Sequence, residues 1–419
     1  MFVAVFWVSV ALVAYIYVGY PLALKLYCGW RTAGFESEVP TTPRTALLTP
    51  PPTISIVLAA RNEGARLAAR LDNLLSLDYP ARQREIIVVS DGSTDETLDV
   101  LARYSRDVVA IAVPPSGKAL ALNAGVARAT GDVLVFADAR QAFAPDALRE
   151  LVAPLADPRI GGVTGELLLD AESPCRRAGR DRRAAERRAR ARAGVDDRRI
   201  EERRRTLRST IADGVGLYWK YEKQLRRLES AVDSTLGATG AIYAIRRSLF
   251  RPLPPDTILD DVLTPMRVVL QGYRVVFNER AKAFDRAAAD ADAETRRKVR
   301  TLAGNYQILA LEPRLLVPIV NRVWLQYLSH KLGRLAVPYT LLALFASSLV
   351  LAASSALYAA VLAAQVVFFL LAGAGALLEL DARRKDAAWA ARFGVPAASA
   401  ASANPKPETR HPVPAGGAA

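Results

Sequence analysis

Cysteine and histidine are almost missing from this chain of 419 residues, which contains two of each. The cysteines are Cys28 and Cys175, and the histidines are His330 and His411. These few residues cannot build a disulfide framework or a Cys/His metal site, because such structures need several ligands at short spacing. Any metal ion bound by this chain must therefore be held by oxygen ligands.

Acidic residues are also outnumbered, with 42 against 56 lysines and arginines, so the net charge is +14. The location of this charge matters more than its size, because net basicity alone would fit a nucleic-acid-binding protein. Residues 171–212 contain fifteen arginines and seven acids, which is +8 of the +14. We interpret 171–212 as an Arg-rich insert that forms a solvated helix, is disordered, or binds anionic lipid headgroups. It contains no aromatic residue, which disfavours a nucleic-acid site, and we expect no nucleic-acid partner.

Charge is absent from long segments near both ends. Residues 2–20 contain none, and apolar character continues to Tyr27, which predicts a transmembrane anchor over 1–27. A cleaved signal peptide is the alternative, but a basic n-region and a small-residue cleavage site are missing. Residues 335–378 are also uncharged, which predicts two transmembrane helices over 335–379.

Basic residues beside these segments predict their orientation. Lys25, Arg31 and Arg44 follow the first segment, and residues 383–385 are basic after the last. The positive-inside tendency then predicts an inner-membrane protein whose following domain is cytoplasmic.

The remaining segments outside the globular part have distinct compositions. Residues 28–52 are predicted to be a linker, and residues 313–334 mix apolar and basic residues with Trp324 and Tyr327 in the manner of an interfacial helix. The Ala- and Pro-rich residues 380–419 are predicted to be a disordered cytoplasmic tail.

Apolar strands alternate with amphipathic helical runs in the globular part. Strands are expected at 54–60, 85–91, 108–113 and 131–138, with helical runs at 65–77 and 96–104. This alternation predicts an α/β domain with a mostly parallel, doubly wound sheet.

Acidic residues end two of these strands, at Asp91 and Asp138. Ligands of such sheets bind at the carboxyl ends of strands, so both carboxylates are expected on one rim, although Asp-Gly-Ser is also ordinary turn chemistry. Residues 116–118, Ser-Gly-Lys, are similar to a phosphate loop. Such a loop also needs Gly at 112 and Ser or Thr at 119, and both positions are Ala, so a nucleoside triphosphatase is not expected.

Taken in order, the motifs resemble those of family 2 nucleotide-sugar glycosyltransferases, membrane-anchored enzymes that include polysaccharide synthases and ceramide glucosyltransferase-like enzymes. The similarity covers roughly residues 52–310 and rests on Ala60-Arg61-Asn62-Glu63, Ser90-Asp91-Gly92-Ser93, Gly117-Lys118, Phe136-Ala137-Asp138, Thr239-Gly240-Ala241, Leu259-Asp260-Asp261, and Arg297 and Arg300 with Gly304. The resemblance implies an α/β, GT-A (Rossmann-like) domain over 53–312, with one N-terminal and about two C-terminal transmembrane helices.

The resemblance implies that the nucleotide-sugar donor is held by Arg61, Glu63, Asp91 and Lys118. Asp138 corresponds to the first acid of the family's D-x-D element, which binds Mg²⁺ or Mn²⁺ against the pyrophosphate. Arg140 stands in the place of the second acid. Either Asp138 alone holds the metal together with water and phosphate oxygens, or Arg140 itself neutralises the diphosphate.

Asp261, with Asp260 beside it, matches the family's general base, which deprotonates an acceptor hydroxyl as that oxygen attacks the anomeric carbon with inversion. Arg297 and Arg300 fall at the family's Q-x-x-R-W element, with Thr301 in the place of Trp, and would stabilise the departing diphosphate. The acceptor side is expected to include Thr239, Gly240 and Trp219. An aromatic residue such as Trp219 is otherwise a core residue.

The predicted function is transfer of a sugar from a UDP-sugar to a lipid-linked or polysaccharide acceptor at the cytoplasmic membrane face, in cell-envelope or exopolysaccharide synthesis. Membrane lipids and polysaccharide assembly proteins are the further expected partners. The alternative hypothesis is a catalytically silent scaffold in a polysaccharide assembly complex, motivated by Arg140 and Thr301.

Overall fold

The computed structural model describes residues 1–34, 50–170, 219–286 and 291–393. The Arg-rich insert 171–212, most of the linker 28–52 and the end of the tail lie outside these residues. The chain divides into two compact units, which are residues 11–340 and residues 1–10 with 341–419. Each unit is described by itself.

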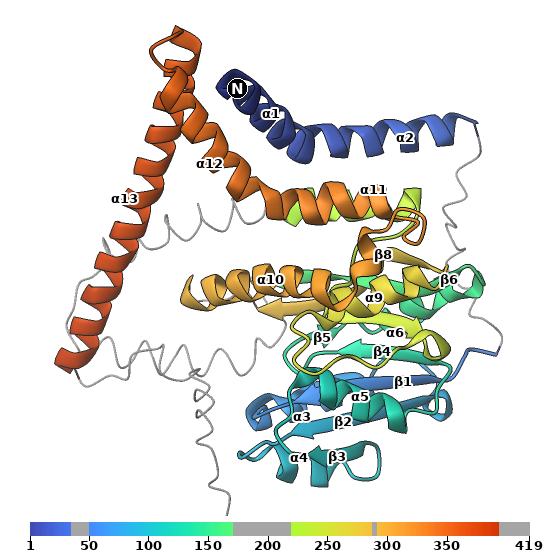
Figure 1. The fold of residues 1–419 in the computed structure, drawn as a ribbon. Helices are drawn as coiled ribbons and strands as arrows, with labels where there is room; N and C mark the ends of the chain where they lie inside the picture. The colour runs from blue at the N-terminus through green and yellow to red at the C-terminus, as the bar shows by residue number, and fades with distance from the viewer. Residues whose placement is uncertain (35–49, 171–218, 287–290, 394–419) are drawn as a thin grey trace, which may run out of the picture. The chain divides into compact units, whose positions relative to one another are not determined.

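A mixed sheet of eight strands forms the centre of the larger unit, in the order β3-β2-β1-β4-β7-β6-β8-β5 (Figure 1). The strands are β1 Ile54–Ala60, β2 Arg84–Asp91, β3 Val109–Val113, β4 Val133–Ala137, β5 Ala142–Phe143, β6 Ile160–Asp170, β7 Ile242–Arg246 and β8 Arg274–Arg286. The first four are parallel. β7 is antiparallel to both of its neighbours, β5 is antiparallel to β8, and β6 is parallel to β8. The expected α/β sheet is confirmed, but only its first half is uniformly parallel.

Helices cover both faces of this sheet because its central strands are apolar on both sides. The helices are α3 Gly64–Leu75, α4 Thr97–Arg103, α5 Lys118–Arg128, α6 Ala147–Val152, α9 Asp260–Leu270 and α10 Ala291–Leu311, and residues 219–232 are also helical. Short 3₁₀ turns lie at η2 Ala81–Gln83, η3 Ala153–Ala156, η4 Arg247–Leu249 and η5 Pro313–Leu316. One core joins Ile56 to Leu71 of α3, and the other joins Val57 to Leu122 of α5 and Met266 of α9. The second core therefore positions α5 and α9 on the same face.

Three helices among the described residues are long and apolar enough to cross a membrane: Phe2–Trp30, Trp324–Leu351 and Ala356–Leu378. The first span lies within α1 Phe2–Ala14, the π-helical turn η1 Tyr15–Gly19 and α2 Tyr20–Gly34. The second is formed by α11 Trp324–Gln326, the π-helical turn η6 Tyr327–Leu332 and α12 Gly333–Leu351. The third lies within α13 Ala356–Phe393. The number and approximate positions agree with the prediction of one N-terminal and two C-terminal helices.

The helix boundaries differ from the predicted ones in three places. The N-terminal helix continues to Gly34, beyond the expected end at Tyr27. Residues 313–334 do not form one helix, because the chain makes the turn η5 at Pro313–Leu316 and is α-helical again only from Trp324. The expected disordered tail begins inside α13, which reaches Phe393. Residues 394–419 lie outside the described residues.

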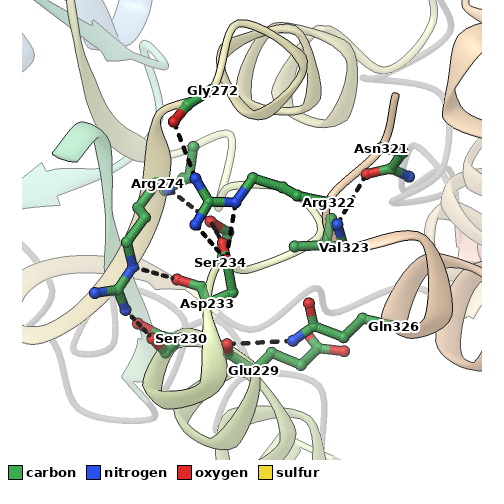
Figure 2. A network of polar contacts seen from close by, with 11 residues as sticks. Glu229, Ser230, Asp233, Ser234, Gly272, Arg274, Asn321, Arg322, Val323 and Gln326 are labelled. Carbon is green, nitrogen blue, oxygen red and sulfur yellow. Dashed lines mark hydrogen bonds and ion pairs between the residues drawn. The ribbon is translucent and has the colours of Figure 1, made fainter. Parts of the chain in front are cut away.

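A polar network fastens the end of helix 219–232 to the chain just before α11 (Figure 2). Arg322 Nε donates to Asp233 Oδ2 at 2.9 Å and Arg322 Nη1 donates to the carbonyl of Gly272 at 2.9 Å. Arg274 Nε donates to the carbonyl of Asp233 at 2.8 Å, and Gln326 Nε2 donates to the carbonyl of Glu229 at 3.3 Å. These bonds hold helix 219–232 beside η6, next to the start of α9.

Candidate active site

Two loops at the carboxyl ends of β1 and β2 are tied to each other. The backbone N–H of Thr94 donates to Asn62 Oδ1 at 2.8 Å, and the N–H of Gly64 donates to Asp95 Oδ2 at 3.0 Å. Asn62 has a φ of 54°, a left-handed conformation that Asn tolerates better than most residues. The two loops therefore form one unit that contains the predicted donor residues Arg61, Glu63 and Asp91.

Asp91 ends β2 and uses its carboxylate to hold the next loop. Its Oδ1 accepts the N–H of Ser116 at 2.6 Å, and both of its oxygens lie 3.1 Å from the N–H of Gly117. Arg61 Nη1 lies 3.9 Å from Asp91 Oδ2. Asp91 thus has a structural role in this structure, because it fixes the turn that begins α5 and delivers Lys118 to the site.

Lys118 lies between two carboxylates that come from different elements. Its Nζ is 3.1 Å from Asp138 Oδ1, just after β4, and 3.2 Å from Asp260 Oδ1, at the start of α9. Burial alone would lower the pKa of Lys118, but the charges of Asp260 and Asp138 outweigh this effect and raise it. The ammonium group therefore stays charged, and Lys118, Asp138 and Asp260, all predicted site residues, form one cluster.

Asp261 lies beside this cluster, against the segment before β7. The N–H of Ala238 donates to the carbonyl of Asp261 at 2.7 Å. A Cβ on Gly240 would lie only 2.8 Å from Asp261 Oδ2, so the backbone at 240 passes directly over the carboxylate. Burial, and then the charge of Asp260, raise the pKa of Asp261 from its ordinary 3.8 to about 6. A carboxylate with this pKa is ionised at neutral pH and also accepts a proton readily.

Helix α10 packs closely against the residues that precede Asp261. A Cβ on Gly304 would lie 2.5 Å from Leu259 Cγ, which only a glycine at 304 avoids. Arg300 Nη2 donates to the carbonyl of Ile258 at 3.2 Å. The structure therefore places Arg300 next to the start of α9, with Arg297 nearly one turn earlier on the exposed part of α10.

The three predicted acceptor residues have different surroundings. Gly240 touches Asp261, as described above. Thr239 accepts a hydrogen bond from Arg226 Nη1 at 2.6 Å and its N–H donates to Thr164 Oγ1 at 2.8 Å, so it positions Arg226. Trp219 is partly buried at the start of helix 219–232 and does not line the cavity beside Asp261.

This cavity, which we call the polar cavity, has a volume of about 160 Å³. It is lined by Glu222, Arg226, Glu229, Leu236, Gly237, Ala238, Leu259, Asp261, Val262, Thr301, Asn305, His330 and Lys331. Sequence reasoning missed its charged lining residues from helix 219–232 and η6, because these segments lie far from Asp261 in the chain. The one available signal was Lys331, a basic residue close to a long apolar segment, where such residues usually have a function.

The residues around Asp138 do not form a preformed divalent-metal site. Position 140 carries an exposed arginine in the place of a second acid, and Asp138 is already paired with the Lys118 ammonium. The described residues contain no group of three His, Cys, Asp or Glu side chains that could hold a metal ion. The Lys118 ammonium thus accompanies Asp138, where a metal site would need further oxygen ligands.

Comparison with known proteins gives the family of this domain. The family profile described as glycosyl transferase family 2 matches residues 55–250. Residues 55–250 belong to that family. This glycosyltransferase domain contains the tied loops, Asp91, Lys118 and Asp138, whereas Asp260 and Asp261 follow it directly.

Curated relatives are similar over part of their length. The chain is 25% identical over 269 residues to the probable glycosyltransferase YdaM of Bacillus subtilis, which is 62% of this chain and 56% of that protein. It is 31% identical over 134 residues to a beta-monoglucosyldiacylglycerol synthase of Synechocystis sp., covering 30% of this chain and 28% of that protein. It is 33% identical over 117 residues to a poly-beta-1,6-N-acetyl-D-glucosamine synthase of Staphylococcus epidermidis, covering 27% and 28%. The chain thus spans little more than half of the first relative and under a third of the others.

One solved structure is similar over most of the chain. It is the mannosyltransferase PcManGT from Pyrobaculum calidifontis in complex with GDP-Man and Mn²⁺, with a TM-score of 0.60 and 23% identity. The match covers 88% of this chain and 92% of that one. This likeness confirms the expected GT-A fold.

Proposed function

We propose that this glycosyltransferase moves a sugar, with inversion, from a UDP-sugar to a lipid-linked or polysaccharide acceptor. The observation that carries the proposal is the position of Asp261. It lies between the cluster of Lys118, Asp138 and Asp260 on one side and the polar cavity on the other. A general base at this position can reach an acceptor in the cavity while a donor diphosphate lies near the cation of the cluster.

In this proposal the tied loops after β1 and β2 hold the nucleoside, and the diphosphate lies towards Lys118, Arg140 and Arg300. Asp261 takes the proton from the acceptor hydroxyl as that oxygen forms a bond to the anomeric carbon. The bond between the anomeric carbon and the diphosphate oxygen breaks, and its electron pair leaves with the nucleoside diphosphate. The cations stabilise the negative charge that develops on this leaving group.

We also propose that Lys118 and Arg140 provide most of the charge compensation for the diphosphate. The guanidinium of Arg140 can contact two phosphate oxygens at once, and the buried ammonium of Lys118 acts as a fixed positive charge. The Mg²⁺ or Mn²⁺ expected from the family resemblance is then not a strict requirement. The Mn²⁺ ion bound in the PcManGT complex is described for that protein alone.

The three apolar helices and the basic residues that flank them support a proposed location. We propose an inner-membrane protein whose catalytic domain faces the cytoplasm, where nucleotide sugars are available. The acceptor classes are supported by the relatives, whose names specify a glycolipid synthase and a polysaccharide synthase.

Arg140 in the place of a metal ligand also favours a second function, a catalytically silent scaffold in a polysaccharide assembly complex. The test is release of nucleoside diphosphate by the purified full-length chain in nanodiscs of a bacterial polar lipid extract, with a panel of UDP- and GDP-sugars. The glycosyltransferase proposal predicts release from one donor that disappears in Asp261→Asn and persists in Asp256→Asn, a nearby exposed acid. Absence of both release and donor binding would instead favour the scaffold.

A further inference from the structure

The polar cavity contains two cations that have no carboxylate partner within 4 Å among the described residues. Among the described residues, the side chain of Arg226 donates only to the hydroxyl of Thr239, at 2.6 Å. The ammonium group of Lys331 makes no hydrogen bond or ion pair with these residues. The two cations come from helix 219–232 and from η6, so they approach the cavity from two different elements. Glu222, Glu229 and Asp261 line the same cavity, but none of them pairs with either cation within 4 Å, so both cations are available to contact an anionic ligand.

Glu222 and Glu229, which also line this cavity, contact other groups of the protein, and Glu229 Oε2 is buried without a hydrogen-bond partner among the described residues. Glu229 accepts a hydrogen bond from the Tyr20 hydroxyl at 3.0 Å and lies 2.7 Å from His330 Nδ1. Glu222 pairs with Arg334 and lies 3.7 Å from His330 Nε2. Burial would raise the pKa of Glu222, but His330 and Arg334 together lower it well below its usual value. These two acids thus contact the protein, and they line the cavity together with Arg226, Lys331 and Asp261.

A second, larger cavity, which we call the apolar groove, has a volume of about 570 Å³. It is lined by Leu12, Tyr15, Ile16, Tyr306, Leu309, Leu325, Leu328, Ser329, Leu332, Gly333, Leu335, Ala336 and Tyr339. It shares two walls with the polar cavity. On α10, Thr301 and Asn305 line the polar cavity and Tyr306 and Leu309 line the groove. On η6, His330 and Lys331 line the polar cavity, whereas Ser329 and Leu332 on either side of this pair line the groove.

Apart from Tyr306 and Leu309 of α10, the residues that line the groove belong to two of the helices that are apolar enough to cross a membrane, Phe2–Trp30 and Trp324–Leu351. A groove on membrane-spanning helices would lie within reach of the hydrocarbon chains of the bilayer. The network shown in Figure 2 fixes helix 219–232 against the chain that leads into α11. It therefore holds this wall of the polar cavity in place next to the apolar groove.

We propose that the acceptor is an anionic membrane lipid whose headgroup carries both a phosphate and a free hydroxyl. Arg226 and Lys331 bind the phosphate, the hydroxyl lies at Asp261, and an acyl chain occupies the apolar groove. The hydroxyl gives its proton to Asp261 and its oxygen forms the new glycosidic bond, while the nucleoside diphosphate leaves. This inference rests on the proposed function and restricts its acceptor to one chemical class.

The test uses the full-length chain in nanodiscs that contain phosphatidylcholine and phosphatidylglycerol, an anionic lipid with headgroup hydroxyls. Lipids retained by the protein are identified by native mass spectrometry. We expect the wild type to retain phosphatidylglycerol in preference to phosphatidylcholine. Arg226→Gln and Lys331→Met should each reduce this preference about tenfold or more, because each removes a charge-assisted contact. Lys220→Met, an exposed lysine on the same helix as Arg226, should retain the wild-type preference.

Filling the groove tests the hydrocarbon part of the proposal. Ala336→Trp should weaken lipid retention, whereas Ala360→Trp, at an exposed position of α13, should not. Equal retention of the two lipids by the wild type, or an unchanged preference in both charge variants, would overturn the proposal. Transfer of sugar to diacylglycerol or to soluble glycerol phosphate as efficiently as to phosphatidylglycerol would also overturn it.

Donor binding is measured separately on the same samples by calorimetry with UDP- and GDP-sugars. Donor binding without a preference for the anionic lipid refutes the acceptor inference and leaves the glycosyltransferase proposal standing. Lipid preference without donor binding refutes the glycosyltransferase proposal instead. The two failures are therefore distinguishable.

Discussion

Replacing Asp261 by Asn removes the proposed general base while keeping the size and shape of the side chain. General-base catalysis contributes roughly 10²- to 10⁴-fold to such reactions, so we expect kcat to fall by this factor. Donor affinity should change little, because the cavity places Asp261 on the acceptor side. The assay is the steady-state release of nucleoside diphosphate by the chain in nanodiscs, with Asp256→Asn as the matched control. An Asp261→Asn enzyme within a few-fold of wild-type kcat would refute the assignment.

The pH profile tests the same residue in the wild type. Because burial and Asp260 raise the pKa of Asp261 to about 6, kcat/KM should decline below that pH, by about tenfold for each pH unit. Asp260→Asn removes a neighbouring negative charge, so the pKa of Asp261 should fall and the decline should move to lower pH. The interval from about pH 5 to about pH 8 extends at least one unit on either side of the expected pKa. A flat profile of kcat/KM over this interval would contradict the assignment of Asp261 as the general base.

The same pKa shift predicts an effect on stability. A carboxyl group whose pKa is raised on folding binds its proton more tightly in the folded state than in the unfolded state. The stabilising contribution of Asp261 is therefore complete below pH 3.8, the pKa of the unfolded state, and is lost as the pH rises through about 6, the pKa of the folded state. Two pKa units correspond to about 3 kcal/mol, which is an upper limit for the cost of ionised Asp261 at neutral pH. Asp261→Asn should therefore raise the thermal midpoint at neutral pH relative to the wild type. A lower midpoint for the variant would contradict this account.

Three further predictions follow from the site. Release of nucleoside diphosphate should persist in EDTA, and Arg140→Asp, which restores a D-x-D sequence, should create Mn²⁺ binding that is detectable by electron paramagnetic resonance. Gly240→Ala would place a Cβ 2.8 Å from Asp261 Oδ2 and should reduce kcat at least about tenfold, whereas Gly373→Ala, with nothing within 4 Å, should be neutral. Lys118→Met leaves two carboxylates without their shared cation and should destabilise the chain by about 3 kcal/mol in urea unfolding, with weaker donor binding by calorimetry.

The parts of the fold that the sequence predicts are those set by local pattern. The apolar run before Asp91 and the run before Asp138 predict two parallel strands that end on one rim, and the structure has both in the parallel half of the sheet. Turn residues give the same kind of local signal, as at Gly117, where the φ of 91° favours glycine. The antiparallel half could not be predicted in this way, because the direction in which β7 enters the sheet depends on residues far away in the chain.

The site shows the same division between local and distant information. Lys118 and Asp261 are predicted from their motifs, but no local pattern says that Lys118 bridges two carboxylates, 20 and 142 positions further along the chain. Arg226 and Lys331 share no motif, and they meet only because tertiary contacts such as those of Figure 2 bring helix 219–232 to η6. Hydropathy likewise does not detect the non-helical segment between η5 and Trp324.

The charges around Asp261 lead to a final expectation for the complete reaction. Lys118 and Lys331 each lower the pKa of Asp261, and they do so from opposite sides, against the raising effects of burial and Asp260. A donor diphosphate near Lys118 and a lipid phosphate at Lys331 would partly neutralise these cations, so the pKa of Asp261 should rise when both substrates are bound. The acid limb of kcat, which reports the enzyme with both substrates bound, should then lie at higher pH than the limb of kcat/KM, which reports the free enzyme. Coincident limbs would mean that neither phosphate approaches these two lysines.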